Sequence, residues 1–389
     1  MSETVDKSIV DEYVHEGGEH EYIDDLDSIS GADRERMTLA GIDTTGDERS
    51  GTYIQKDHSV VHCNVAQEGL EIMDIQTALK THDWLEEYLW RIVPRDKDEF
   101  TKKVVEKPHL GYFIRALPGV KSLRPVQACL YLATNNISQN VHNIIIAEEG
   151  SELHIITGCS TTPGLASGLH IGVSELYVKK NASLSFTMIH NWGEGITVRP
   201  RSATRIEDGG RFVNNYIILN PVETIQMYPM AYLEGDDSVA RFNSVLVAPK
   251  GAEMDIGSGV VLTGARSRAE IISRAITTGG RITARGRLIG KVPGARAHLE
   301  CKGLILGDGS VIAIPELEGH SEGLEMSHEA AVGRINQDEI QYLMARGLSE
   351  EEAISVIVRG FLKVDMEGLP PELQTEIDKN IRLGDSGAM

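Results

Sequence analysis

The sequence is poor in aromatic residues and cysteine, and it lacks long apolar runs. Its 389 residues include only 3 Trp, 11 Tyr and 6 Phe, whereas 39 Gly make up about a tenth of the chain. No stretch approaches the roughly 18 consecutive apolar residues of a membrane-spanning helix. The N-terminus lacks the basic region and apolar core of a secretory signal. We therefore expect a cytoplasmic protein with many tight turns.

Positive charge is also scarce. The chain has 38 Lys and Arg against 58 Asp and Glu, a net charge of −20. A field of this sign repels phosphate backbones and anionic lipid, so we expect neither nucleic acid nor a membrane as a partner. Residues 1–50 alone hold 15 acidic and 4 basic residues. This imbalance predicts an acidic, loosely ordered arm over 1–50.

The four cysteines do not form a local motif. Cys63, Cys129, Cys159 and Cys301 lie far from one another in the sequence, whereas zinc and redox motifs use close pairs. Free cysteine is among the most buried residue types, and disulfides are rare in a reducing cytosol. Spacing alone therefore predicts four structural thiols.

Residues 51–110 differ from the acidic arm. Ser59–Cys63 predicts a short strand, and apolar residues at helical spacing predict a helix over Ile75–Trp90. This segment is typical of a small helical or mixed N-terminal unit.

The segment 111–314 consists of short runs rich in Val, Ile, Thr, Phe and Tyr, separated by small turn clusters. Its turn residues recur at a nearly regular interval, which is about twice as long in the earlier part: Gly150, Asn181, Gly209, Gly235, Gly251, Gly264, Gly279, Gly294 and Gly309. A half-coil of about 15 residues and a full coil of about 30 residues are what a β-solenoid requires, because each coil stacks on the previous one. We expect a mainly β protein with a solenoid core, although a β-sandwich shares some of these features.

The segment 315–389 predicts a helical region. Asn336 can cap one helix, and Ser349 with Glu352 forms a capping box before a second. The second helix carries an apolar face made of Ala353, Ile354, Ile357, Val358 and Phe361. These helices either cap the open end of the solenoid or dock a partner.

Several ordered motifs resemble one known family. They are Gly158-Cys159, Leu169-His170, Asn191-Trp192, Cys301-Lys-Gly-Leu-Ile-Leu-Gly-Asp-Gly309, Ile314-Pro-Glu-Leu-Glu318, His328-Glu329-Ala-Ala, Gln337-Asp-Glu339 and Tyr342-Leu-Met-Ala-Arg-Gly-Leu348. Their order and spacing resemble SufB and SufD, the scaffold proteins of the SUF iron–sulfur cluster assembly system. The resemblance extends from about residue 50 to about residue 375.

The resemblance implies a right-handed parallel β-helix that works as an assembly scaffold and not as an enzyme. It implies three partners: a SufC-type ABC ATPase bound by the C-terminal helices, a second SufB- or SufD-type protomer, here as a homodimer, and a cysteine desulfurase or other sulfur donor. ATP would belong to the ATPase, and the sequence contains no Gly-x-x-x-x-Gly-Lys-Ser/Thr phosphate loop. The residues do not decide whether a flavin serves as the electron source.

The resemblance also assigns a cluster site. It makes Cys301 the cluster-binding thiolate and Glu329 a second, exchangeable ligand, with His328 beside it. Soft sulfur suits iron in such clusters, and a carboxylate binds it more weakly. Ser327 stands where the family often has a glutamate, and an Arg-x-Asn pair common in SufB is not apparent near Tyr131.

A second set of residues lies on the sulfur route implied by the resemblance. Cys159 would accept sulfur from a donor, and His190 and Trp192 would line the path through the β-helix interior. A persulfide on a buried thiol in electropositive surroundings suits such a relay. His190 stands where the family commonly has Gln. Without the resemblance, packing in the core explains His190 and Trp192 as well as a role on the sulfur route does.

Two other classes share parts of this pattern. A β-helix polysaccharide lyase or hydrolase would need acidic and basic residues aligned on one face, and usually a secretory signal. A hexapeptide-repeat acyltransferase would show a six-residue period, which is absent. A purely structural β-solenoid that mediates interactions is the remaining alternative, and it should take up neither iron nor sulfide.

Overall fold

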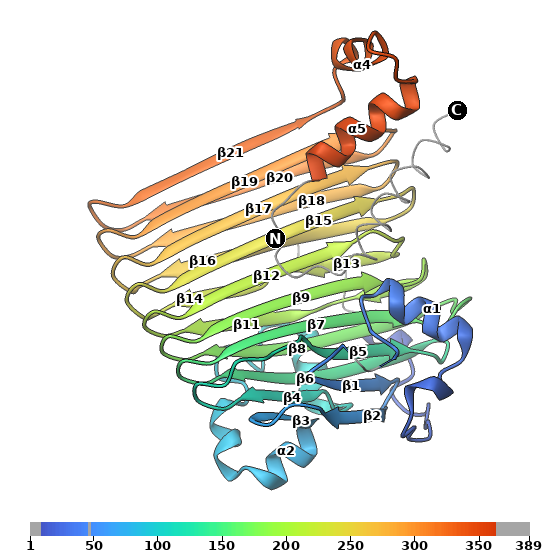
Figure 1. Cartoon of the computed structure of the whole chain (residues 1–389), viewed down its shortest axis with the longest axis vertical. Helices are drawn as coiled ribbons and strands as arrows, with labels where there is room; N and C mark the ends of the chain where they lie inside the picture. The colour runs from blue at the N-terminus through green and yellow to red at the C-terminus, as the bar shows by residue number, and fades with distance from the viewer. Residues whose placement is uncertain (1–8, 46–47, 363–389) are drawn as a thin grey trace.

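Most of the chain forms a stack of β-strands. The computed structural model describes residues 9–45 and 48–362. Figure 1 shows the strands side by side along the long axis, from β2 and β3 near one end to β20 and β21 near the other. This arrangement confirms the predicted mainly β class and its β-solenoid core.

The strands of the described residues form two sheets. The first sheet has ten strands, in the order β2 (Ser59–Val65), β1 (Gly51–Lys56), β5 (Val126–Leu132), β7 (Glu152–Thr161), β9 (Ser183–Asn191), β12 (Arg211–Ile218), β15 (Val239–Ala248), β17 (Arg268–Thr277), β19 (Arg296–Ile305) and β21 (Glu325–Gly333). The second sheet has eleven, in the order β10 (Ile196–Val198), β13 (Thr224–Met227), β16 (Glu253–Leu262), β14 (Met230–Leu233), β11 (Arg201–Ile206), β8 (Gly168–Val178), β6 (Ile137–Ala147), β4 (Tyr112–Ala116) and β3 (Leu70–Asp74), with β18 (Arg281–Gly290) and β20 (Ser310–Gly319) joined through β16.

The helices lie at the two ends and on the outside of the strand stack (Figure 1). The α-helices of the described residues are α1 (Gly31–Leu39), α2 (Ile75–Thr81), α3 (Glu99–Glu106), α4 (Gln337–Met344) and α5 (Glu350–Leu362), and the 3₁₀ helices are η1 (Val10–Glu12), η2 (Leu26–Ser28) and η3 (Asp83–Tyr88).

Parallel pairing between successive coils explains the repeat in the sequence. Along the first sheet, Val239 pairs with Arg268, Arg268 with Arg296, and Arg296 with Glu325. These steps are nearly equal in length, and each is close to the predicted coil of about 30 residues. Because side chains alternate between the two faces of a strand, every second residue points into the solenoid.

Inward residues stack in columns that form one continuous core. One column of the first sheet is entirely apolar: Leu153, Leu184, Phe212, Ala240, Ala269 and Ala297. Burying a large aliphatic or aromatic side chain contributes about 1.5–3 kcal/mol before the loss of conformational entropy. The core thus extends through the coils, as in other repeat proteins.

Two of the turn glycines are required by close stacking of the coils. A Cβ atom on Gly264 would lie 1.8 Å from the Gly235 carbonyl oxygen, and one on Gly235 would lie 2.0 Å from the Asp208 backbone nitrogen. No side chain fits at such a distance. Glycine therefore recurs here because the backbones of successive turns touch.

The acidic arm is more ordered than its charge predicted. In residues 9–45, the Ser30 side chain caps α1, and Met37 and Ile42 pack in a buried cluster with Tyr131. Arg36 donates to the backbone carbonyls of Asn191 and Trp192. The expectation of a loose arm is wrong for these residues, because charge counting ignored their spaced apolar side chains. Residues 1–8 lie outside the described part.

The helix expected over Ile75–Trp90 is interrupted. The helix α2 ends at Thr81, and η3 follows after His82, which has an extended backbone conformation. The chain turns here so that Leu85, which is fully buried, can reach the outer cluster that includes Phe113 and Val173. Packing on the solenoid therefore overrides helical periodicity in this segment.

The strands also continue past the expected end of the β-helix at Ile314. Strands β20 and β21 carry the sheets to Gly333, so 315–333 is β-structure and not part of a helical region. The two predicted helices then follow with their predicted caps at Asn336 and Ser349. Residues 363–389 of the expected helical region lie outside the described part.

Within residues 9–45 and 48–362, no helix combines the length and apolar character needed to cross a membrane.

Candidate functional site

Cys159 lies inside the solenoid, where it pairs with His190 in the register of β7 and β9. The Cys159 side chain is 1% exposed, and His190 and Trp192 are each 2% exposed. The Trp192 indole N–H donates to His190 Nδ1 over 2.8 Å. The fold therefore brings together the three residues that the resemblance placed on a sulfur route.

The other ring nitrogen of His190 has no hydrogen-bond partner. An indole N–H can only donate, so Nδ1 accepts and Nε2 carries the ring proton. Nε2 is buried, with no partner in the described structure. Burial, and then the nearby His170, lower the pKa of His190 well below its ordinary value. The ring is therefore neutral near pH 7, and its unpaired N–H costs about 1–3 kcal/mol.

A cavity of about 20 Å³ lies next to these side chains. Cys159, His170, Met188, His190 and Tyr216 are among its lining residues. This volume is enough for about one water molecule. A buried polar group beside such a space can donate a hydrogen bond to a small guest.

The Cys159 thiol is not in electropositive surroundings, contrary to expectation. Burial, and then the charge of Cys129, raise the pKa of Cys159 well above its ordinary value. The thiol is therefore protonated near pH 7. His170, which sequence reasoning matched but did not assign to the site, lines the same cavity, and burial lowers its pKa to about 3.

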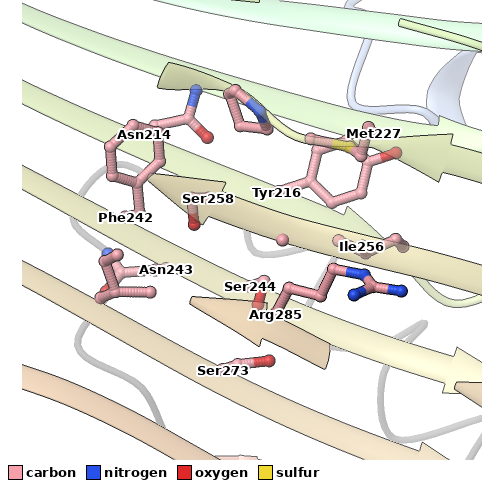
Figure 2. Close-up of a pocket in the computed structure, with 13 residues that line it drawn as sticks. Asn214, Tyr216, Met227, Phe242, Asn243, Ser244, Ile256, Ser258, Ser273 and Arg285 are labelled. Atoms are coloured by element: carbon pink, nitrogen blue, oxygen red, sulfur yellow. The ribbon is translucent and has the colours of Figure 1, made fainter. Parts of the chain in front are cut away.

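A narrower cavity of about 10 Å³ continues along the interior and shares Asn214, Tyr216 and Met227 with the first. Figure 2 shows Ser244 and Ser273 among the side chains that line this region, together with Tyr216, Phe242 and Arg285. Small hydroxyl side chains at these inward positions leave space that larger apolar side chains would fill.

One inward column connects this region to Cys301. Its members in register are Thr157, Met188, Tyr216, Ser244, Ser273 and Cys301. Cys159 follows Thr157 by two residues and points to the same side of β7. Five strand spacings separate β7 from β19, which is about 24 Å at about 4.8 Å per strand. Most side chains along the line between the two cysteines are therefore polar or small.

Cys301 is buried in the core beside Ser273 and Ala330. Its side chain is 1% exposed. Burial raises the pKa of the Cys301 thiol to about 11, even though the charge of Arg274 lowers it. The thiol is consequently protonated near pH 7 and must lose its proton to bind a metal.

The structure does not bring Cys301 and Glu329 together within one chain. Glu329 pairs with Glu300, and Ala330 pairs with Cys301. Because strand residues alternate, Glu329 lies on the outer face of the first sheet, whereas Cys301 faces inward. His328 is on the inward side of β21 but is exposed, because this strand is at the open end of the stack.

Instead, Glu329 belongs to a cluster that sequence reasoning missed. One ligand atom each from His298, Glu300 and Glu329 lie within 4.8 Å of one another. The Lys302 ammonium is 2.9 Å from Glu300 and 3.3 Å from Glu329. The alternation His298-x-Glu300-x-Lys302 was visible in the sequence, but the partner strand that supplies Glu329 was not.

The predicted partner-binding residues of α5 are divided between two environments. Val358 is 1% exposed, and Ile354 and Phe361 pack on the same cluster against the outer face of the first sheet. Ile357 instead lines a groove of about 360 Å³ between α4 and α5. The solenoid itself therefore covers Val358, one of the residues predicted to bind a partner, whereas Ile357 borders the groove.

The remaining two cysteines take structural positions. Cys129 is fully buried among outer-face residues such as Ile54 and Tyr131, and Cys63 packs partly buried at the side of the main core. No disulfide links the four cysteines, which are all in the described residues.

Comparison with known proteins agrees with this architecture. Residues 130–361 match the family model described as SUF system FeS cluster assembly, SufBD core domain. A protein of Archaeoglobus fulgidus named iron–sulfur cluster assembly SufBD family protein is 52% identical over 356 residues, covering 91% of this chain and 96% of its own length. A protein of the same family from Methanothermobacter thermautotrophicus is 46% identical over 378 residues, covering 96% of this chain and 92% of its own.

A more distant relative, from Pyrococcus horikoshii, is 27% identical over 375 residues, covering 94% of this chain and 84% of its own length. The family model and the two nearer relatives each cover more than half of this chain. The chain belongs to the SufBD family of iron–sulfur cluster assembly proteins.

Proposed function

We propose that this chain is a scaffold on which sulfur and iron are combined into a nascent cluster, and that sulfur travels inside the solenoid. The observation that carries this proposal is the interior line from Cys159 to Cys301, with the unpaired His190 Nε2–H beside its start. A solenoid that served only as a structural element would gain stability by filling this line with apolar side chains.

The first step would be sulfur transfer to Cys159. The Cys159 thiolate attacks the outer sulfur of a donor persulfide, such as that of a cysteine desulfurase. The donor leaves as a thiolate, and Cys159 becomes a persulfide. His190 Nε2–H, which lacks a partner and borders the same cavity as Cys159, would donate to the terminal sulfur. The raised pKa of Cys159 means that its proton must leave to solvent or to the donor before attack.

The second step would bring the sulfur to the surroundings of Cys301, about 24 Å away. Thiol exchange cannot cross this distance in one move, so the sulfur must travel through the interior as a small species. Before it travels, an external two-electron donor such as a reduced flavin would cleave the S–S bond of the Cys159 persulfide with uptake of one proton, which gives the Cys159 thiolate and hydrosulfide as the small species. The Cys301 thiolate would hold iron, because soft sulfur suits iron in such clusters.

The open end of the solenoid would carry a second protomer. Strands β20 and β21 are edge strands of the described sheets, and Ile312, Leu317 and Val332 are exposed there. An unpaired edge with apolar side chains favours pairing with another chain. A homodimer formed here would bring two Cys301 residues and two Glu329 residues to one interface.

The C-terminal helices would dock an ABC-type ATPase through the surface left free by the solenoid. Tyr342, Met344 and Val356 are exposed on α4 and α5, and Ile357 lies in the groove between these helices. Interfaces concentrate their binding energy in a few such aromatic and aliphatic anchors. The ATPase, and not this chain, would bind and hydrolyse ATP.

Anaerobic reconstitution tests the scaffold role. With iron and sulfide, the purified chain should develop visible charge-transfer absorption and retain both elements after desalting. A chain that retains neither iron nor sulfide would contradict the proposal and favour a structural solenoid.

A further inference from the structure

The cluster of His298, Glu300 and Glu329 lies on the outer face of β19 and β21, on the side of the first sheet opposite to Cys301. We propose that it is a binding site for a first-row divalent cation, Fe²⁺ in function, separate from the thiol inside the solenoid. This inference rests on the proposed scaffold function, which it extends by giving iron and sulfur different entry points.

The ligand set suits such an ion. Imidazole and carboxylate together bind divalent iron, manganese and zinc, whereas a purely carboxylate site favours magnesium or calcium. Metal–ligand distances of about 2.0–2.2 Å require ligand atoms within about 4.4 Å of one another. The three side chains already approach to within 4.8 Å. Small side-chain rotations would complete the geometry.

A positive charge already occupies the space between the carboxylates. Lys302 Nζ lies 2.9 Å from Glu300 and 3.3 Å from Glu329, so the two oxygens are arranged around one cation. Partial burial raises the pKa of Glu300, but the hydrogen bond from Lys302 and the charges of Arg274 and Lys302 outweigh this effect and keep its pKa below the ordinary value.

Lys302 can leave when a metal enters. Its side chain is 31% exposed, and lysine has a flexible four-carbon stem. Arg274 contacts Glu300 over 2.5 Å, and its side chain is only 12% exposed, so it can stay and orient that carboxylate. Lys302 therefore acts as a replaceable cation, while Arg274 keeps the Glu300 carboxylate in position.

Other ion pairs on this face lack these features. Arg241 pairs with Glu270, and Arg296 pairs with Glu325, each as a single cation with a single carboxylate. Neither carboxylate belongs to a group of three candidate ligands in the described residues. Glu325 is consequently a matched control, because it lies on the same strand as Glu329 and also forms an ion pair.

Binding of Mn²⁺ to the full chain, followed by electron paramagnetic resonance, tests the site without forming any cluster. We expect one Mn²⁺ per chain and a loss of affinity of about 10- to 100-fold or more in Glu300→Gln and in Glu329→Gln. Glu325→Gln should bind like the wild type. Lys302→Met should bind more tightly, because the competing ammonium is gone.

Two outcomes would overturn the proposal: no Mn²⁺ bound by the wild type at millimolar concentration, or an equal loss in Glu325→Gln. If Glu300→Gln does not fold because Arg274 loses its partner, His298→Asn tests the same site, and unchanged affinity in that variant overturns the proposal. Thermal unfolding of each variant shows whether a loss of Mn²⁺ affinity comes from the missing ligand or from a chain that does not fold.

Cys301→Ser distinguishes this inference from the scaffold function. Unchanged Mn²⁺ affinity in Cys301→Ser supports two separate sites, whereas its loss contradicts them. If Cys301→Ser still assembles a cluster, the role proposed for Cys301 fails even though the cation site stands.

Discussion

Glu300 and Cys301 are neighbours in β19, yet one side chain lies on the surface and the other inside the solenoid. Outside, Glu300 is ionised, with Arg274 and Lys302 in contact. Inside, Cys301 is protonated because burial raises the pKa of its thiol to about 11. The contrast shows how one strand can present a hard, charged carboxylate on one face and a soft thiol, neutral until it loses its proton, on the other.

The interior around Cys159 shows the same neutral character. His170 and His190 both have pKa values lowered by burial, and Cys159 has a raised one. No ion pair is needed there, because the side chains are kept in their uncharged forms. Such an interior suits passage of a neutral or singly charged sulfur species better than passage of a metal ion.

The sharpest test of this contrast is Cys301→Ser. We expect it to abolish the visible charge-transfer absorption after anaerobic reconstitution, because serine does not replace a thiolate as a ligand for iron in a cluster. Glu329→Ala should allow a cluster that forms poorly or is lost faster, since it keeps the thiolate and removes only a carboxylate on the outer face, which binds iron more weakly. Absorption spectra and iron content measure both effects.

Cys63→Ser is the control for that experiment, because Cys63 is in β2, at the end of the first sheet opposite to β19 and β21. It should assemble a cluster like the wild type. Unchanged iron content in Cys301→Ser would contradict the assignment, and a collapsed fold would make Cys301 a structural residue.

The second test concerns Cys159. We expect Cys159→Ser to assemble a cluster when sulfide is supplied in excess, but to fail when sulfur must come from a desulfurase, because only the second route needs a persulfide at this position. Mass spectrometry of the wild type after incubation with the desulfurase should show one added sulfur on Cys159. Equal loss under both conditions would indicate a ligand role instead of a relay.

The third test compares the two sides of α5. Val358→Ala should lower the free energy of unfolding by about 2 kcal/mol, because it leaves a cavity against the first sheet. Val356→Ala should change it by less than about 0.5 kcal/mol, yet weaken binding of the ATPase. Chemical denaturation and calorimetric titration measure the two quantities. Equal effects of both variants on stability would contradict the orientation of α5.

The last test concerns the pH dependence of stability. The pKa of His170 is about 3 in the fold, against 6.5 ordinarily, so below pH 6.5 the unfolded chain binds a proton that the folded chain does not. This residue's contribution is complete above pH 6.5 and is lost as pH falls toward 3, by up to about 1.4 kcal/mol per pH unit. His170→Gln should flatten that slope in denaturation curves recorded between pH 7 and 4. An unchanged slope would contradict the neutral interior.

The sequence alone predicted the elements whose causes are local. The turn spacing indicated the coil length, because every coil must return to the same place on the stack. Asn336 and Ser349 marked the starts of α4 and α5, because a capping side chain acts within three residues. The ordered motifs indicated the family, which the comparisons confirmed.

Other features depended on contacts between distant segments. Side chains alternate along a β-strand, so the sequence shows that Glu300 and Cys301 point to opposite faces of β19. Only the stacking of both sheets decides which face is the interior. The same stacking places Glu329 beside Glu300, although a whole coil of the chain lies between them. Charge counting likewise could not show that α1 rests against β7 and β9, where Arg36 binds backbone carbonyls.

The sequence by itself thus determined that this chain winds into a β-solenoid with two capped helices, because periodicity and capping are short-range effects. The tertiary structure decided that Cys301 is inside, that Glu329 joins His298 on the surface, and that Val358 is covered. The reason is physical: side-chain direction follows from the local backbone, whereas burial and the proximity of ligands follow from which coil lies against which.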